Sequence, residues 1–158
     1  GSSLDLWRKA FEVNVLSIEN IVSKILPKLQ EFWPHRIISI GSVHDSLTSA
    51  GMAPYSVSKS ALASWVRAAA IDLKGKGVTA ISVSVGAMDS AKLQEGLSRF
   101  SNPQEKLDSL VSRLPSGRLV DPEDLADLCI ALFDQSMIHL AGSTIKFDGG
   151  ASTLLGTE

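Results

Sequence analysis

The chain has 158 residues, of which 44% are hydrophobic and 20% are charged, and its formal net charge is −2. This composition fits one soluble globular unit with a hydrophobic core, and it excludes a fibrous or disordered chain. Because no stripe of basic residues is present and charges break every apolar run before membrane-spanning length, we expect neither a nucleic acid nor a membrane as a partner.

The N-terminal part of the chain predicts a long helix followed by a buried strand. Residues Gly1 to Asp5 lack the basic and apolar regions of a signal peptide, so we expect a cytoplasmic protein or one of an organelle matrix. Between Leu6 and Leu29, apolar residues recur at alternating steps of four and three, the pattern of an amphipathic helix. The β-branched run from Ile37 to Ile40 precedes Gly41-Ser42 and predicts a strand that ends in a turn.

The middle of the chain alternates between the two kinds of element. Tyr55 to Leu73 is rich in alanine and follows Pro54, which suits the first turn of a helix. Val78 to Val85 predicts a second strand. Ala87 to Arg113 has a less regular helical pattern that is interrupted at Asn102-Pro103, and we interpret it as a lid.

The C-terminal part completes the pattern with a helix and a third strand. Asp121 and Pro122 combine a helix cap with a proline at the first helical position, and that helix should run to about Asp134. Thr144 to Phe147 predicts the third strand. Alternating strands and helices indicate an α/β fold with a doubly wound parallel sheet, and no shift in composition divides residues 1–158 into domains.

A tyrosine and a lysine stand four residues apart in one predicted helix, at Tyr55 and Lys59, so their side chains share a face. A nearby ammonium favours the phenolate form of a tyrosine, and such a pair can supply an acid or a base close to neutral pH. Ser42 and Gly86 each follow a predicted strand, and parallel sheets bind ligands at the carboxyl ends of their strands. We therefore expect these residues to line one crevice.

Several motifs in this order resemble the short-chain dehydrogenase/reductase family in its single-domain form. They are Phe11–Val15, Ile38–Ser42, Tyr55–Lys59, Val85–Ser90 and Phe147–Gly150. Tyr55 follows Ser42 by thirteen residues, which is the usual interval in the family. The resemblance extends over nearly the whole chain and implies a Rossmann-like fold.

The resemblance implies a catalytic set that consists of Asn14, Ser42, Tyr55 and Lys59. In the family, the tyrosine exchanges a proton with the substrate oxygen while a hydride moves to or from the nicotinamide, so Tyr55 would be the general acid/base. Lys59 would support Tyr55 and bind the nicotinamide ribose. Ser42 would hold the substrate oxygen, and Asn14 would anchor a proton-relaying water at a local helix distortion. Taken singly, Ser42 could be only a turn residue and Asn14 only a polar surface residue.

The same resemblance assigns the cofactor, NADP(H) or NAD(H), to a loop as well as to the Tyr55 helix. Val85, Gly86, Met88 and Ser90 would contact the nicotinamide, although Ser90 could also be only a helix cap. Valine stands here where the family usually has proline before the glycine, which restores an N–H and loosens the backbone. His44 is close to Ser42 in sequence and would border the substrate together with Ser42 and Tyr55. No histidine has partners at metal-ligand spacing, so we expect no metal site.

One family feature has no counterpart in this chain, namely the glycine-rich turn that holds the cofactor pyrophosphate at a helix N-terminus. The chain therefore resembles the C-terminal half of a reductase, without the N-terminal phosphate-binding half, and by itself it should be inactive. Three explanations stay open: the chain is part of a longer polypeptide, the other half is a separate chain, or this half assembles with copies of itself.

The expected activity is the interconversion of a carbonyl and a secondary alcohol, similar to that of 3-oxoacyl thioester reductases. The alternative is a non-catalytic subunit or fragment that acts only in structure or assembly. As in the family, we expect a homodimer or homotetramer built on the Asn14 and Tyr55 helices, with a small carbonyl or alcohol as the substrate.

Overall fold

The computed structural model describes residues 2–29 and 34–153 of the chain. Its sheet contains the parallel strands β1 (His35–Ile40), β2 (Val78–Val85) and β3 (Thr144–Phe147), in the order β1-β2-β3. The bounds of β2 and β3 match the sequence prediction. β1 starts two residues earlier than predicted, because His35 and Arg36 pair with the first residues of β2 even though their side chains are polar.

The long N-terminal helix is interrupted, in contrast to the single helix predicted over Leu6–Leu29. It consists of α1 (Leu4–Phe11), a π-helical turn (Glu12–Leu16), α2 (Ser17–Ile25) and a 3₁₀ turn (Leu26–Lys28). The Ser3 hydroxyl accepts a hydrogen bond from the Leu6 amide at 3.4 Å and caps the start. Pro27 lies in the 3₁₀ turn, and because proline has no amide proton it ends the α-helical ladder there.

Helix α3 (Ala53–Asp72) packs closely on the sheet through small side chains. It begins one residue before Pro54, which occupies its first turn as predicted, and it ends within one residue of the predicted Leu73. Ala69 and Ala80 are both buried in one cluster, so the helix backbone can approach the strand.

The remaining helices follow β2, and each begins at a polar cap. They are α4 (Ala91–Leu97), α5 (Pro103–Val111) and α6 (Pro122–Ala131), capped by Ser90, Asn102 and Asp121. The predicted break at Asn102-Pro103 is therefore the start of α5. Helix α6 ends three residues before the predicted Asp134, and a 3₁₀ segment, Gln135–Leu140, leads back to β3.

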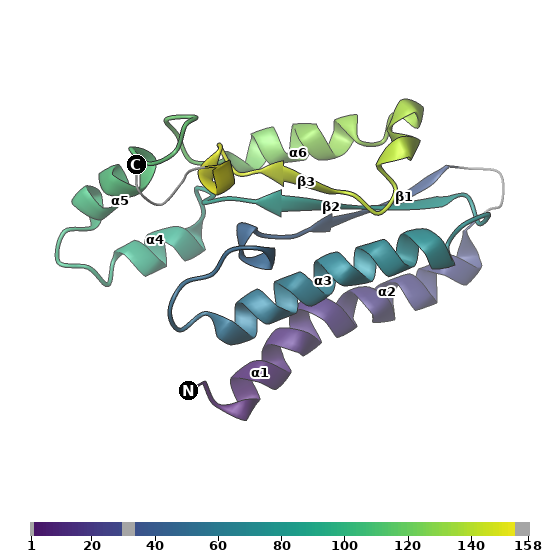
Figure 1. Cartoon of the computed structure of the whole chain (residues 1–158), viewed down its shortest axis with the longest axis horizontal. Coiled ribbons are helices and arrows are strands. Elements are labelled where there is room, and N and C mark those ends of the chain that lie inside the picture. The colour runs from purple at the N-terminus through teal and green to yellow at the C-terminus, as the bar shows by residue number, and fades with distance from the viewer. Residues whose placement is uncertain (1, 30–33, 154–158) are drawn as a thin grey trace.

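The layers form an α/β arrangement that places all strand carboxyl ends on one side (Figure 1). Helices α1 to α3 cover one face of the sheet, α6 lies on the other face, and α4 and α5 lie beyond the carboxyl ends. Strand β2 is buried along its whole length between its two neighbours. The predicted α/β class with a parallel sheet is confirmed. No helix within residues 2–29 and 34–153 is both long and apolar enough to cross a bilayer.

Candidate active site

Ser42 and Tyr55 are brought together by a short turn at the carboxyl end of β1. The Gly41 amide donates to the Val83 carbonyl at 2.7 Å, which fixes the strand end against β2. Ser42 then caps the 3₁₀ turn Val43–Asp45, and its Oγ accepts a hydrogen bond from the His44 amide at 3.3 Å. The cap role that the sequence left open for Ser42 is thus present, while its hydroxyl proton has no acceptor among the described residues.

The His44 ring lies against the Tyr55 ring, which connects this turn to the first part of α3. Their ring centroids are 5.5 Å apart and the planes are inclined at 73°, an edge-to-face contact. No hydrogen bond engages the Tyr55 hydroxyl in the described part of the chain, so it is available to a bound molecule. Ser42, His44 and Tyr55 therefore form one cluster.

Lys59 lies one helical turn beyond Tyr55 and is held toward the same strand end. Its ammonium donates to the Ile40 carbonyl at 3.0 Å and is 5.8 Å from the centroid of the Tyr55 ring. Burial lowers the pKa of Lys59, and the Asp45 carboxylate opposes part of that shift. The ammonium has three donors, and the Ile40 carbonyl uses one of them, so two remain for hydroxyl groups of a ligand.

Asn14 reaches this cluster from the π-helical turn that interrupts the N-terminal helix. Its side-chain amide donates to Ser58 Oγ at 2.9 Å, and Ser58 Oγ donates to the Tyr55 carbonyl at 2.7 Å. A helix distortion at Asn14 was expected from the family resemblance, and π turns often occur at functional sites. Ser58, which is fully buried, was not predicted; its place directly before Lys59 on the inner face of α3 was the available signal.

The loop after β2 carries the other predicted cofactor residues. Val85 ends β2, and the Gly86 amide donates to the Phe147 carbonyl at 3.1 Å. Met88 forms a parallel bridge with Val120, which fixes the middle of the loop. Ser90 caps α4 through its Oγ, which accepts from the Leu93 amide at 3.3 Å, so its cap role is present.

This loop and the Tyr55 cluster lie at the same end of the sheet, because β1 and β2 are adjacent and parallel. No hydrogen bond or ring contact joins the loop to Tyr55 among the residues that the structure describes. A ligand that bridges them would therefore complete the site. In the same part of the chain, no group of histidine, cysteine or acidic side chains is arranged to hold a metal ion.

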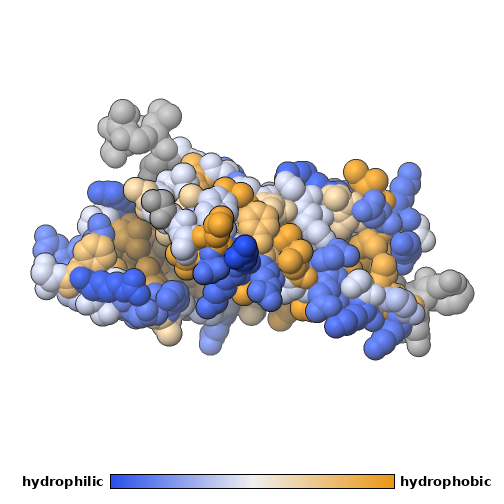
Figure 2. All heavy atoms as spheres, turned by 90° about the horizontal axis from the view of Figure 1, so that it is seen from below, coloured by the Kyte–Doolittle hydropathy of each residue, from blue (hydrophilic) through white to orange (hydrophobic). Residues whose placement is uncertain are grey.

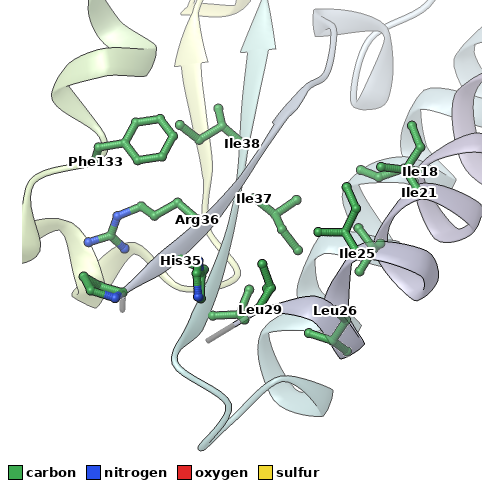
Figure 3. Close-up of a pocket in the computed structure, with 13 residues that line it drawn as sticks. Ile18, Ile21, Ile25, Leu26, Leu29, His35, Arg36, Ile37, Ile38 and Phe133 are labelled. Carbon is green, nitrogen blue, oxygen red and sulfur yellow. The ribbon is translucent and has the colours of Figure 1, made fainter. Parts of the chain in front are cut away.

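An apolar groove lies elsewhere, between α2 and the outer edge of β1 near the amino ends of the strands (Figure 3). Its volume is about 420 Å³, and Ile18, Ile25, Ile37 and Phe133 are among the residues that line it. None of the predicted site residues lines this groove, so it is separate from the Tyr55 cluster.

Comparison with known proteins gives a family match over nearly the whole chain. A family model described as enoyl-(acyl carrier protein) reductase matches residues 1–152. Dehydrogenase/reductase SDR family member 6 of Rattus norvegicus is 28% identical over 147 residues, which are 92% of this chain and 60% of the relative. The 3-oxoacyl-(acyl-carrier-protein) reductase FabG of Vibrio cholerae is 26% identical over 144 residues, 91% of this chain and 57% of the relative.

Solved structures agree in fold. The ligand-free aldohexose dehydrogenase of Thermoplasma acidophilum superposes with a TM-score of 0.91 at 19% identity, and the match covers 99% of this chain and 63% of that one. The Pseudomonas aeruginosa RhlG/NADP active-site complex gives a TM-score of 0.81 at 25% identity, with 96% and 59% covered.

These matches share one property, which is that the chain spans only about three fifths of the length of the relatives. The resemblance found in the sequence motifs and the Rossmann-like fold are both confirmed, for the part of the relatives that the chain covers. On the strength of the family model and the parallel α/β fold, the chain belongs to the short-chain dehydrogenase/reductase family of oxidoreductases.

Proposed function

We propose that the protein is a nicotinamide-dependent oxidoreductase that interconverts a carbonyl and a secondary alcohol. The observation that carries this proposal is the cluster at the carboxyl end of β1. The Lys59 ammonium lies 5.8 Å from the centroid of the Tyr55 ring, and the His44 ring, two residues after Ser42, contacts the Tyr55 ring. A phenol, an ammonium and a hydroxyl are the groups that a proton transfer coupled to hydride transfer needs.

In this mechanism each residue has a separate task. The Tyr55 phenol gives its proton to the carbonyl oxygen during reduction and takes it back during oxidation. Lys59 stabilises the phenolate by its charge, and Ser42 donates its free hydroxyl proton to the same substrate oxygen and orients it. Asn14 holds the start of α3 through Ser58 and keeps Tyr55 in position. A bound nicotinamide supplies or accepts the hydride.

The residues present fit part of such a cofactor. The two unused Lys59 donors suit the hydroxyls of the nicotinamide ribose, and the loop with Val85, Gly86, Met88 and Ser90 lies at the same sheet end. The glycine-rich turn for the pyrophosphate has no counterpart in this sequence. We infer that NADP(H), named with the RhlG structure, or NAD(H) binds only where a further polypeptide segment completes the site.

The open edge of β1 is where we place that completing segment. β1 pairs with β2 alone, so its outer backbone groups have no strand partner among the described residues. Beside this edge lies the apolar groove, where Ile37 of β1 points toward Ile25 of α2 and Ile38 points to the other side of the strand, toward Phe133 (Figure 3). An unpaired edge next to apolar surface fits an added strand with apolar side chains. The segment would be the N-terminal half, from the same or another polypeptide.

Substrate type, assembly and location are finer proposals. The FabG relative is named as a 3-oxoacyl reductase, which supports a 3-oxoacyl thioester as the substrate of this protein. Apolar residues interrupt the hydrophilic surface seen in Figure 2, and Leu6, Val13 and Leu16 on the N-terminal helix are more than half exposed. These exposed side chains support a homodimer or homotetramer. A cytoplasmic location stays a prediction.

The second candidate function is that of a non-catalytic subunit. Under this alternative the Tyr55 cluster would only stabilise the fold.

Replacement of Tyr55 by phenylalanine tests the enzyme proposal, because the ring stays and only the hydroxyl is lost. We expect kcat for carbonyl reduction by the full chain, meaning the protein completed with its N-terminal half, to fall by about 10²-fold to 10⁴-fold, with reduced nicotinamide still bound. Steady-state rates and cofactor fluorescence measure the two effects. Ser98→Ala, which removes an exposed hydroxyl directly after α4, should leave both unchanged. Unchanged turnover in Tyr55→Phe, or a full chain that binds no nicotinamide, would favour the subunit alternative.

A further inference from the structure

His44 is held rigidly between the two residues that face the substrate oxygen in the proposed mechanism. Its amide is bound to Ser42 Oγ at 3.3 Å, and its ring contacts the Tyr55 ring with centroids 5.5 Å apart. The turn that carries His44 is itself fixed to α3, because Ser60 Oγ donates to the Asp45 carbonyl at 2.6 Å. The imidazole therefore has a defined position against the Tyr55 ring.

The two ring nitrogens of His44 differ in their surroundings. Nδ1 is buried and has no hydrogen-bond partner in the described part of the chain. Nε2 has no partner there either, but it is not buried, so a bound molecule can reach it. A second atom of the same turn, Asp45 Oδ2, is also buried without a partner. Buried polar atoms are nearly always hydrogen-bonded, so two exceptions in one turn mark it as unusual.

The unpartnered Nδ1 decides which nitrogen carries the proton. A proton on Nδ1 would be a buried donor without an acceptor, and such donors are rarer in folded proteins than acceptors without a donor. The neutral imidazole therefore carries its proton on Nε2, the nitrogen that is not buried. His44 thus presents one hydrogen-bond donor next to Tyr55.

We propose that His44 is a specificity-determining residue, whose Nε2–H donates to a second oxygen of the substrate close to the reacting carbonyl. The preferred substrates are then carbonyl compounds with another acceptor oxygen nearby, such as oxo esters and oxo thioesters, and simple alkyl ketones are poor substrates. This inference rests on the proposed function, because it uses the carbonyl that Tyr55 protonates.

The test compares two substrates of equal chain length, ethyl 3-oxobutanoate and heptan-2-one, which differ in the ester oxygens. The ratio of their kcat/KM values is measured for the full chain and for His44 variants. Differences in intrinsic reactivity between the two substrates cancel, because only the change of this ratio between variants is used.

Matched substitutions separate the hydrogen bond from ring packing. His44→Phe keeps an aromatic ring against Tyr55 but removes both nitrogens, and it should lower the ratio by about 10-fold. Glutamine reaches as far as Nε2 and asparagine only as far as Nδ1. We therefore expect His44→Gln to keep most of the preference for the ester and His44→Asn to lose it. A ratio that stays the same in the Phe and Asn variants would overturn the proposal.

A binding experiment separates this inference from the proposed function. In a Tyr55→Phe background, calorimetry measures the affinity of the cofactor-loaded full chain for ethyl 3-oxobutanoate. We expect His44→Phe to weaken it by about 10-fold. If the variant with Tyr55 intact shows no turnover, or if Tyr55→Phe leaves turnover unchanged, while His44→Phe still weakens the affinity, then only the enzyme proposal or the role of Tyr55 is wrong. If turnover depends on Tyr55 but His44→Phe leaves the affinity for ethyl 3-oxobutanoate unchanged, then only the proposed role of His44 is wrong.

Discussion

At the scale of single residues, Lys59 shows burial and charge acting in opposite directions. Burial destabilises the ammonium and lowers its pKa, whereas the Asp45 carboxylate stabilises it. The Ile40 carbonyl, 3.0 Å away, satisfies one of its donors. Burial has the larger effect on the pKa. The charged form of Lys59 therefore destabilises the folded protein relative to the unfolded chain, where the side chain is hydrated.

This cost predicts a pH dependence of stability. The folded pKa of Lys59 lies below the ordinary value of 10.5, so between the two values the unfolded chain binds more protons than the folded one. The free energy of unfolding should therefore rise as pH increases through this window. Below the window, the full destabilisation by the buried Lys59 ammonium is present. Urea unfolding at about pH 7 and about pH 10 measures the rise, which Lys59→Met should reduce.

Lys24→Met is the control for this measurement, because Lys24 is exposed on α2. It should keep the same rise in stability as the wild-type chain. An equal rise in the Lys59→Met variant would contradict the expectation.

At the scale of elements, the contact between the loop after β2 and the end of β3 depends on a glycine. A Cβ added at Gly86 would lie 2.7 Å from the Cα of Asp148, which is backbone and cannot move aside alone. Asp148 is itself fixed, because its carboxylate accepts from the Gly150 and Ser152 amides at 2.9 and 3.0 Å. The loop can therefore follow β2 at this distance only when residue 86 has no side chain.

We predict that Gly86→Ala destabilises the fold by about 1–3 kcal/mol through overpacking. Gly96→Ala is a matched control, because nothing lies within 4 Å of an added Cβ there. In helix α4 this substitution should stabilise the protein by about 0.5–1 kcal/mol. Denaturant unfolding of both variants measures the difference, and equal effects of the two substitutions would argue against the steric explanation.

Some element boundaries could be predicted from the sequence pattern and others could not. The bounds of β2 were predictable because its apolar residues stand between Gly77 and Gly86, so the signal is local. The π-helical turn around Asn14 was not visible in the apolar pattern, which continues through it. The start of β1 at His35 was missed for a different reason, since only pairing with Val78 makes this polar residue part of the strand.

At the scale of the whole molecule, the apolar groove beside β1 combines exposed apolar side chains with an open strand edge. Ile21 and Ile25 on α2 are 54% and 49% exposed, and the neighbouring strand edge is unpaired. Contiguous apolar surface beside an open edge promotes association. We expect the 158-residue chain, purified by itself, to self-associate in sedimentation velocity experiments.

Ile25→Glu should weaken this self-association by about 10-fold, because a carboxylate in the groove would have to be desolvated. Ile71→Glu is the control: Ile71 on α3 is 75% exposed and does not line the groove. It should leave the association constant near the wild-type value. A monomeric wild-type chain, or equal effects of both substitutions, would show that the groove is not the contact surface.

The order of helices and strands and the identity of the motif residues could be predicted from the sequence, because periodicity and turn chemistry are local properties of the chain. Which of these residues come into contact depends on the tertiary structure. The Asn14 amide reaches Ser58 across 44 positions of the sequence, and Lys59 reaches the end of β1 across 19. Such contacts depend on how α3 packs on the sheet and on α1, and this packing results from the summed burial of side chains from many elements.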